Sequence, residues 1–205
     1  MTRPINLDAI FEAAIFAALK HHGQVRKDEQ ASPYITHPLS VAREIYTTGK
    51  IDDQDILIAA LLHDTIEDTH TNADEIRTRF GEEVLSIVLE VTDDKSLEKD
   101  LRKQLQIIHA SELTYSARVI KLADKLVNCR DILHTPPKDW NVIRRQEYIQ
   151  WAANVVAQIR DTNPYLESAF DEILQEAEAG LHFHLDPNET VNDHHPGINP
   201  EDTAH

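Results

Sequence analysis

Residues 56–62 are apolar without a break, and His63 and Asp64 follow them directly. Asp52 or Asp53 can cap a helix just before this stretch, because a short carboxylate accepts hydrogen bonds from the first free N–H groups of a helix. A helix that is apolar on all sides is buried. The rest of the chain must therefore supply enough elements to surround this one.

Helical signals lie on both sides of the apolar stretch. Asn6 can cap a helix that Gly23 ends, and Pro38 fits the first turn of a helix that Gly49 ends. The patterns predict helices over residues 7–22, 37–48, 56–62, 73–81, 82–91, 116–133, 139–160 and 164–180. The chain has only 5 glycines, which disfavours a hairpin-rich β architecture. We therefore expect an all-α fold, a helical bundle.

The helical pattern predicts one domain over residues 1–180, a length that suits a single core. Residues 181–205 differ in character, since they combine acidic residues with histidines and prolines. This composition predicts a disordered tail. The alternative is a segment that collects metal ions, although its histidines lack a regular ligand spacing.

The charge balance narrows the classes of partner. Lys and Arg number 20 against 36 Asp and Glu, a formal net charge of −16, which argues against a nucleic-acid polymer. A small anionic substrate is compatible if a metal or local side chains concentrate positive charge. The chain has no run of about 18 apolar residues, so we expect no membrane span. The single cysteine, Cys129, cannot form an internal disulfide, and we expect a reducing, cytoplasmic location.

His63 and Asp64 are unusual residues for the end of a buried helix. An unpartnered buried carboxylate is very costly, and a divalent metal bound by imidazole and carboxylate would remove that cost. Glu67 and Asp68 follow one turn later. Glu67 lies at i+3 from Asp64 and at i+4 from His63, so it can project toward the same site. The alternatives are a solvated histidine in a C-terminal turn and a solvated acidic helix end.

Polar residues interrupt the apolar positions of the helix predicted over residues 116–133. They are Lys121, Asp124, Lys125 and Asn128. Their spacing of i, i+3, i+4 and i+7 places them on one face of the helix. A solvent-exposed face with an ordinary Lys–Asp pair is one interpretation. Because short acids and amides are poor helix formers, a functional polar face is the other.

His37 stands beside Pro38, downstream of the basic pair Arg26-Lys27 and of Tyr34. A histidine at a helix start is often only a cap, and two adjacent cations are often only exposed. Taken alone, these residues do not indicate a site. Together with the His-Asp pair and the polar helix face, they stand in a recognisable order along the chain.

Six segments in that order carry a resemblance to a known family. They are HHGQVRKDEQASPYITHPLSVA, AALLHDTIEDT, FGEEV, VTDDKSL, VIKLADKLVNCRDI and RRQEYIQWA. The chain resembles the HD-domain hydrolases of guanosine alarmones such as ppGpp. It is most similar to the small stand-alone hydrolases typified by the metazoan SpoT homologue. The resemblance covers about residues 7–170.

The resemblance implies three groups of site residues within an HD-domain helical bundle. The ligands of one buried Mn²⁺ would be His37, His63, Asp64 and Asp124. The pair that activates water would be Glu67 and Asp68. The substrate would be bound by Arg26 and Lys27 near the scissile diphosphate, by Tyr34 and Asn128 at the nucleoside, and by Lys99, Arg144 and Tyr148 near the 5′-phosphates and the pocket wall.

The resemblance also implies the reaction, which is hydrolysis of the 3′-pyrophosphate of ppGpp or pppGpp without synthesis of either. The products would be pyrophosphate and GDP or GTP. Another HD phosphatase activity, on NADPH or ppApp, is an alternative. A catalytically inactive HD module that binds nucleotide is a second alternative, and a purely structural helical protein is a third. The sequence does not indicate the oligomeric state.

Overall fold

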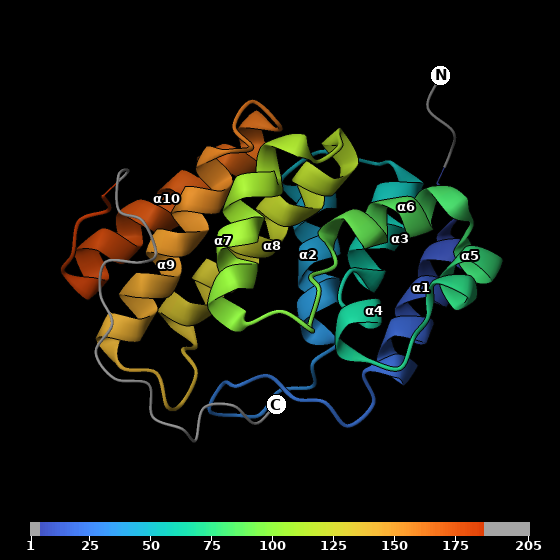
Figure 1. The fold of residues 1–205 in the computed structure, drawn as a ribbon, viewed down its shortest axis with the longest axis horizontal. Coiled ribbons are helices and arrows are strands. Elements are labelled where there is room, and N and C mark those ends of the chain that lie inside the picture. The colour runs from blue at the N-terminus through green and yellow to red at the C-terminus, as the bar shows by residue number, and fades with distance from the viewer. Residues whose placement is uncertain (1–4, 187–205) are drawn as a thin grey trace.

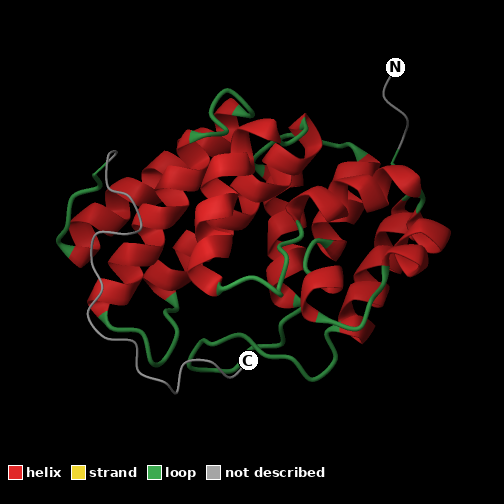
Figure 2. Cartoon of the chain, viewed as in Figure 1, coloured by secondary structure: helices red, strands yellow, loops and turns green. Residues whose placement is uncertain are grey.

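The computed structural model describes residues 5–186, and helices make up its regular structure (Figures 1 and 2). The α-helices are α1 Leu7–Lys20, α2 Thr36–Thr47, α3 Gln54–Leu62, α4 Thr65–Asp68, α5 Ala73–Phe80, α6 Glu82–Val91, α7 Lys99–His109, α8 Tyr115–His134, α9 Val142–Ala157 and α10 Pro164–Leu181. A short 3-10 helix, Ala110–Glu112, follows α7. Within the described part of the chain, the β structure is limited to one isolated bridge between Val25 and Pro33. The all-α prediction is confirmed.

Helix α3 is the buried centre that its apolar run predicted. Every residue from Ile56 to Leu62 is at most 6% exposed. Asp53 caps the helix by accepting hydrogen bonds from the backbone N–H groups of Asp55 and Ile56. Helices α1, α2, α6 and α8 pack around α3. Because the surface of α3 has no polar stripe, it can be covered on all sides, and its last turn is held inside the protein.

Helix α8 is the second central element. It packs against α2, α3, α6, α9 and α10, so it joins the two ends of the molecule (Figure 1). In that view α9 and α10 lie at one end, and α1 and α5 lie at the other. Helices α3 and α8 contact each other directly, which brings the end of α3 near the middle of α8.

Local caps define several of the other boundaries as predicted. Asn6 accepts a hydrogen bond from the N–H of Asp8 at the start of α1. Asn72 and Glu75 form a reciprocal capping box at the start of α5. Gly81 has a φ of 94°, which separates α5 from α6 and which residues with a side chain rarely adopt.

Helix α7 is the main element that the sequence patterns did not predict. No helix was predicted between residues 91 and 116, whereas the structure forms a helix over Lys99–His109. None of the α7 residues is fully buried, so this helix lacks a strong apolar run. It is attached to α9 through a hydrogen bond from Trp151 Nε1 to the carbonyl oxygen of Lys103, 3.0 Å long. The helix predicted over residues 139–160 is shorter, Val142–Ala157, because Asn141 caps it.

The first residues of the segment predicted as a tail pack against the domain. Phe183 and Leu185 lie on the core. Gln150 hydrogen-bonds both the backbone N–H and the carbonyl oxygen of Asp186. Residues 187–205 lie outside the described residues, and the tail stays a prediction for them. Among the described helices, none is long and apolar enough to cross a membrane.

Candidate active site

His63 is the first polar residue after the buried run of α3, and its ring orientation is fixed by the backbone. Its Nδ1 lies 2.8 Å from the carbonyl oxygen of Ala60. Because a carbonyl oxygen only accepts, Nδ1 carries a proton, and Nε2 is the ring nitrogen left to bind a ligand. That Nε2 atom is buried and has no hydrogen-bond partner among the described residues. An acceptor nitrogen held in this way is a typical metal ligand.

His37 reaches the same point from the first turn of α2. Its Nε2 lies 3.1 Å from Asp124 Oδ1 and 3.8 Å from Asp64 Oδ2. The two imidazole rings have their centroids 5.3 Å apart. Pro38 forms part of the same first turn, where the N–H that it lacks would have no helical partner.

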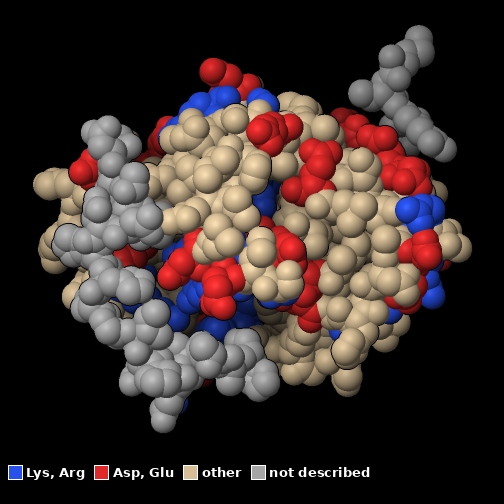
Figure 3. Space-filling model, in the orientation of Figure 1, with Lys and Arg blue, Asp and Glu red and all other residues tan. Residues whose placement is uncertain are grey.

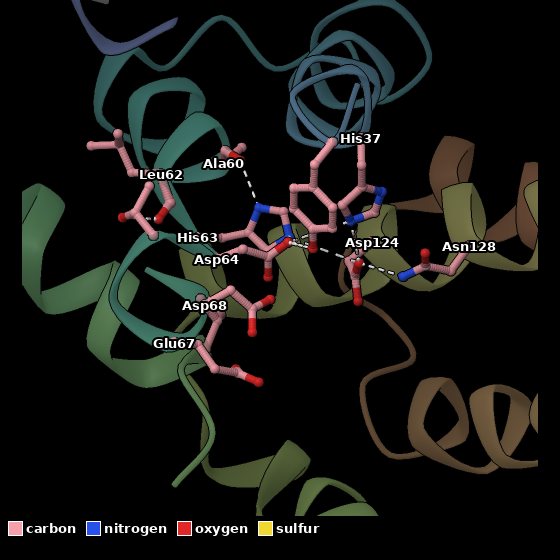
Figure 4. A network of polar contacts seen from close by, with 12 residues as sticks. His37, Ala60, Leu62, His63, Asp64, Glu67, Asp68, Asp124 and Asn128 are labelled. Carbon is pink, nitrogen blue, oxygen red and sulfur yellow. Dashed lines mark hydrogen bonds and ion pairs between the residues drawn. The ribbon is translucent and has the colours of Figure 1, made fainter. Parts of the chain in front are cut away.

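Asp64 lies in the turn between α3 and α4, and its side chain returns toward the imidazoles (Figure 4). Its Oδ2 atom is 3.2 Å from His63 Nε2 and accepts a 2.6 Å hydrogen bond from the hydroxyl of Tyr34. Burial raises the pKa of Asp64, but the neighbouring imidazoles outweigh burial and lower the pKa below its ordinary value. Burial next to this carboxylate also raises the pKa of Tyr34, so its hydroxyl is protonated and donates.

Asp124 comes from the middle of α8 and completes the group. Its Oδ1 accepts a 2.7 Å hydrogen bond from Asn128 Nδ2, and its Oδ2 lies 3.0 Å from Lys125 Nζ. Burial raises the pKa of Asp124, but the Lys125 ammonium and the imidazoles hold the pKa well below its usual range. The carboxylate is therefore ionised and oriented before any ligand arrives.

The donor atoms of His37, His63 and Asp124 all lie within 4.8 Å of one another, and Asp64 Oδ2 lies beside both imidazoles. Two imidazoles and two carboxylates match the ligand types of a divalent first-row cation. A buried imidazole nitrogen without a hydrogen-bond partner, such as Nε2 of His63 among the described residues, is also what a metal site requires of a ligand. The four residues thus fit a mononuclear metal.

Glu67 and Asp68 lie on α4, one turn beyond Asp64, as their spacing predicted (Figure 4). Glu67 Oε2 accepts a 3.0 Å hydrogen bond from the backbone N–H of Asp93, and Glu67 Oε1 lies 3.2 Å from Lys95 Nζ. The same ammonium is 2.6 Å from Asp68 Oδ1. Burial raises the pKa of Glu67, which suits a group that must take a proton near neutral pH. Glu67 lines the site cavity, and Asp68 is not among the lining residues.

The cavity has a volume of about 150 Å³, which is room for an ion and several waters. Its walls come from α2, α4, α6, α7 and α8, from the turn between α3 and α4, and from two loops. The lining residues are Arg26, Tyr34, His37, His63, Asp64, Glu67, Val91, Asp93, Gln106, Ile120, Lys121, Asp124, Lys125 and Asn128. In the space-filling view, Lys and Arg atoms lie in a hollow between acidic groups near the lower middle of the face (Figure 3).

Three of the seven residues predicted to bind substrate line this cavity. Arg26 is held by Asp131 at 2.6 Å and lies 3.4 Å from Asn128 Oδ1. Its guanidinium also faces the ring of Tyr34, 5.9 Å from the centroid. The basic, aromatic and amide groups therefore meet at one end of the cavity.

The other four predicted residues lie outside the lining. Lys27 and Lys99 are exposed. Arg144 packs its guanidinium 4.7 Å from the centroid of the Trp140 ring. Tyr148 stands between Trp140 and Trp151, with ring centroids 5.7 Å and 5.2 Å away. Their role in substrate binding stays a prediction.

The polar face of α8 does not point to solvent. Lys121 is 7% exposed and Lys125 is 3% exposed, so the interpretation as a solvated helix face is wrong. Lys125 lies between the carboxylate of Asp124 and the face of Trp151, 4.4 Å from the ring centroid. Both cations therefore belong to the lining of the cavity rather than to a solvated surface.

Sequence reasoning missed four polar residues around the site. They are Asp93, Lys95, Arg102 and Gln106. All four come from the charged segment after α6 or from α7. The dense charge of this segment was the available signal, but its helix was not recognised, and so its inward face was not identified.

A comparison with protein families matches residues 13–153 to the model of the HD domain. A curated relative from Xenopus tropicalis, named guanosine-3′,5′-bis(diphosphate) 3′-pyrophosphohydrolase MESH1, is 51% identical over 167 residues. That match covers 82% of this chain and 93% of the relative. The Homo sapiens protein of the same name is 47% identical with the same coverage. A guanosine-3′,5′-bis(diphosphate) 3′-pyrophosphohydrolase from Aquifex aeolicus is 37% identical over 132 residues. That match covers 63% of this chain and 18% of the relative.

Solved structures agree with these matches. A structure described as a metazoan orthologue of SpoT that hydrolyses ppGpp has a TM-score of 0.81 and 43% identity. It covers 88% of this chain and 99% of its own. A protein from Listeria monocytogenes EGD-e has a TM-score of 0.58 and 28% identity, and it covers 71% of this chain.

Proposed function

Because the chain belongs to the HD-domain family, and within it to the group of MESH1-type 3′-pyrophosphohydrolases, we propose that it hydrolyses the 3′-diphosphate of guanosine-3′,5′-bis(diphosphate). The relatives that carry this name align over nearly their whole length. The products would be pyrophosphate and GDP, or GTP from the pentaphosphate. The relative named a GTP pyrophosphokinase matches over only 18% of its length, so we expect these 205 residues to hydrolyse and not to synthesise.

The observation that carries the proposal is the convergence of His37, His63, Asp64 and Asp124 on one buried point beside Glu67. We propose that these four residues hold Mn²⁺, since mixed imidazole and carboxylate ligation suits this ion. When bound, the ion would lower the pKa of water and polarise a phosphoryl oxygen. A hydrolase of this kind needs both a cation and a proton acceptor, and the cavity offers ligands for the first and Glu67 for the second.

In this proposal Glu67 takes a proton from the attacking water. A new bond forms from the water oxygen to the phosphorus attached to O3′ of the ribose, and the bond from that phosphorus to O3′ breaks. The ribose oxygen takes up a proton and becomes the 3′-hydroxyl. Arg26 offsets negative charge on the diphosphate, since a guanidinium can bind two phosphate oxygens at once.

Glu67 is held in place for this task by the backbone N–H of Asp93 and by Lys95. Tyr34 donates to Asp64 and Asn128 donates to Asp124, so both carboxylates keep their orientation. Such preorganisation matters because groups that are fixed before the reaction need no reorganisation during it. We also propose a cytoplasmic location, which a single buried free cysteine, Cys129, supports.

Incubation of the protein with ppGpp and Mn²⁺, followed by separation of the products, tests this function. We expect equal amounts of pyrophosphate and GDP. Release of orthophosphate, or hydrolysis of NADPH or ppApp at a much higher kcat/KM than ppGpp, would assign the site to a different nucleotide phosphatase. A chain that binds ppGpp without turnover would be a nucleotide-binding module.

A further inference from the structure

Lys121 differs from the other cations that line the cavity. Arg26 is paired with Asp131 at 2.6 Å, and Lys125 is paired with Asp124 at 3.0 Å. Lys121 has no carboxylate within 4.0 Å among the described residues, although it is only 7% exposed. Within the described part of the chain, its one hydrogen bond goes to the carbonyl oxygen of Val91 and is long, at 3.3 Å.

A buried ammonium with one long hydrogen bond is costly, because it has lost its water shell and two of its three protons lack a protein acceptor. Burial, and after it the neighbouring Lys125 ammonium, lower the pKa of Lys121. Three carboxylates, those of Glu67, Asp93 and Asp124, act on it electrostatically from a distance. Their distance leaves room beside the ammonium, and the cavity is that room.

The position of Lys121 along α8 relates it to the metal ligand set. It precedes Asp124 by three residues, about 4.5 Å along the helix axis, and Asn128 follows Asp124 by four residues, about 6 Å. Asn128 lies beside Arg26. Cationic groups therefore stand on both sides of the proposed metal ligand, Arg26 at one side and Lys121 at the other.

We propose that Lys121 binds phosphate oxygens of the diphosphate at the inner side of the cavity, opposite Arg26. This inference rests on the proposed function for the identity of the anion. The ammonium gains the acceptors that it lacks, and the diphosphate is held from both sides while it is cut from the ribose. Lys121 then binds the product pyrophosphate through the same contact.

The competing explanation is that Lys121 only caps a helix. Val91 is the last residue of α6, and a cation at a helix C-terminus is stabilising in its own right. The chain offers a matched control, because Lys50 Nζ donates to the carbonyl oxygen of Thr47, the last residue of α2, at 2.6 Å. Lys50 is exposed and does not line the cavity.

The test compares wild type, Lys121→Met, Lys121→Arg and Lys50→Met. Each protein is loaded with Mn²⁺, desalted and titrated calorimetrically with inorganic pyrophosphate, and its metal content and melting temperature are recorded. We expect Lys121→Met to bind pyrophosphate roughly 10- to 100-fold more weakly, the range for loss of a charged hydrogen bond. We expect Lys121→Arg to stay within a few fold of wild type and Lys50→Met to bind as wild type does.

Equal pyrophosphate affinity in wild type and Lys121→Met, with a lowered melting temperature in both Met variants, would make Lys121 a helix cap and overturn the inference. If Lys121→Met does not fold, the rate of acylation of Lys121 in the wild type decides. Pyrophosphate should slow that reaction and leave acylation of Lys50 unchanged, and unaltered rates at Lys121 would overturn the inference. If wild type binds pyrophosphate through Lys121 but does not hydrolyse ppGpp, the proposed function fails while this inference stands.

Discussion

His63 donates its Nδ1 proton to the carbonyl oxygen of Ala60 across 2.8 Å, and this one contact fixes the chemistry of the ring. The carbonyl lies one turn earlier in the same helix, so α3 both buries the histidine and selects its tautomer. The free Nε2 atom then faces the carboxylate of Asp64 at 3.2 Å. The polar site is thus built on the end of the most apolar helix of the chain.

Asp124 should be indispensable for metal binding. Asp124→Ala removes one of the converging ligand atoms, and we expect the purified variant to retain little Mn²⁺ and to lose nearly all turnover of ppGpp. Metal content by mass spectrometry and the rate of GDP formation measure the two effects. If the variant hydrolyses ppGpp at the wild-type rate, Asp124 is not part of the metal site. Asp131→Ala, which leaves the ligand set intact, serves as the control for metal content.

Glu67 should act on the chemical step rather than on binding. Glu67→Gln keeps the size of the side chain but cannot take a proton, so we expect kcat to fall by roughly 100-fold or more. Metal content and the affinity for ppGpp should stay near those of wild type. A variant with an unchanged kcat and a raised KM would instead make Glu67 a substrate-positioning group.

The raised pKa of Glu67 also predicts a change in stability with pH. An acid whose pKa is higher in the folded protein than in the unfolded chain binds its proton more tightly when folded. Its contribution to stability is therefore most favourable below the unfolded pKa and declines as the pH rises through the folded pKa. Glu67→Gln should abolish this decline, so the free energy of unfolding of the variant relative to wild type should be higher at pH 7 than at pH 4. Chemical denaturation of the metal-free proteins at both pH values measures it, and a difference that is larger at pH 4 would reverse the sign.

Arg144 should recognise the 5′ end of the substrate, as the family resemblance implies. The structure fixes its guanidinium above Trp140, outside the cavity around the metal ligands. A contact far from the breaking bond acts as uniform binding, so Arg144→Ala should raise KM for ppGpp and leave kcat nearly unchanged. Salt screens such a contact, and the effect should be smaller at high ionic strength. Michaelis constants equal to those of wild type at low and high salt would show that Arg144 does not contact the substrate.

The position of the site could be predicted because local sequence patterns indicate it. The unbroken apolar run of α3 required burial, and His63 and Asp64 at its end then required a polar partner. The spacing of Lys121 and Asp124 placed them on one face of α8. These inferences need only helix periodicity and the cost of burying charge.

Helix α7 was not predicted because its apolar residues Leu101, Leu105 and Ile108, although spaced at i, i+4 and i+7, lie within a dense run of charge, and Gln106 was missed with it. Other features depend on tertiary contacts that no local pattern contains. The burial of Lys121 is set by α6 and by the loop that carries Asp93, not by its own helix. For the same reason the sequence could not separate Arg26, which lines the cavity, from Lys27, which is exposed.

The central claim is that water attacks the phosphorus attached to the ribose 3′ oxygen, at the site formed by His37, His63, Asp64 and Asp124. Hydrolysis of ppGpp by the Mn²⁺-loaded protein in ¹⁸O-labelled water, read by ³¹P nuclear magnetic resonance, tests it most directly. We predict that one labelled oxygen enters the pyrophosphate and that the GDP carries none. Label in the GDP, label in released orthophosphate, or turnover that persists in Asp124→Ala would contradict the account.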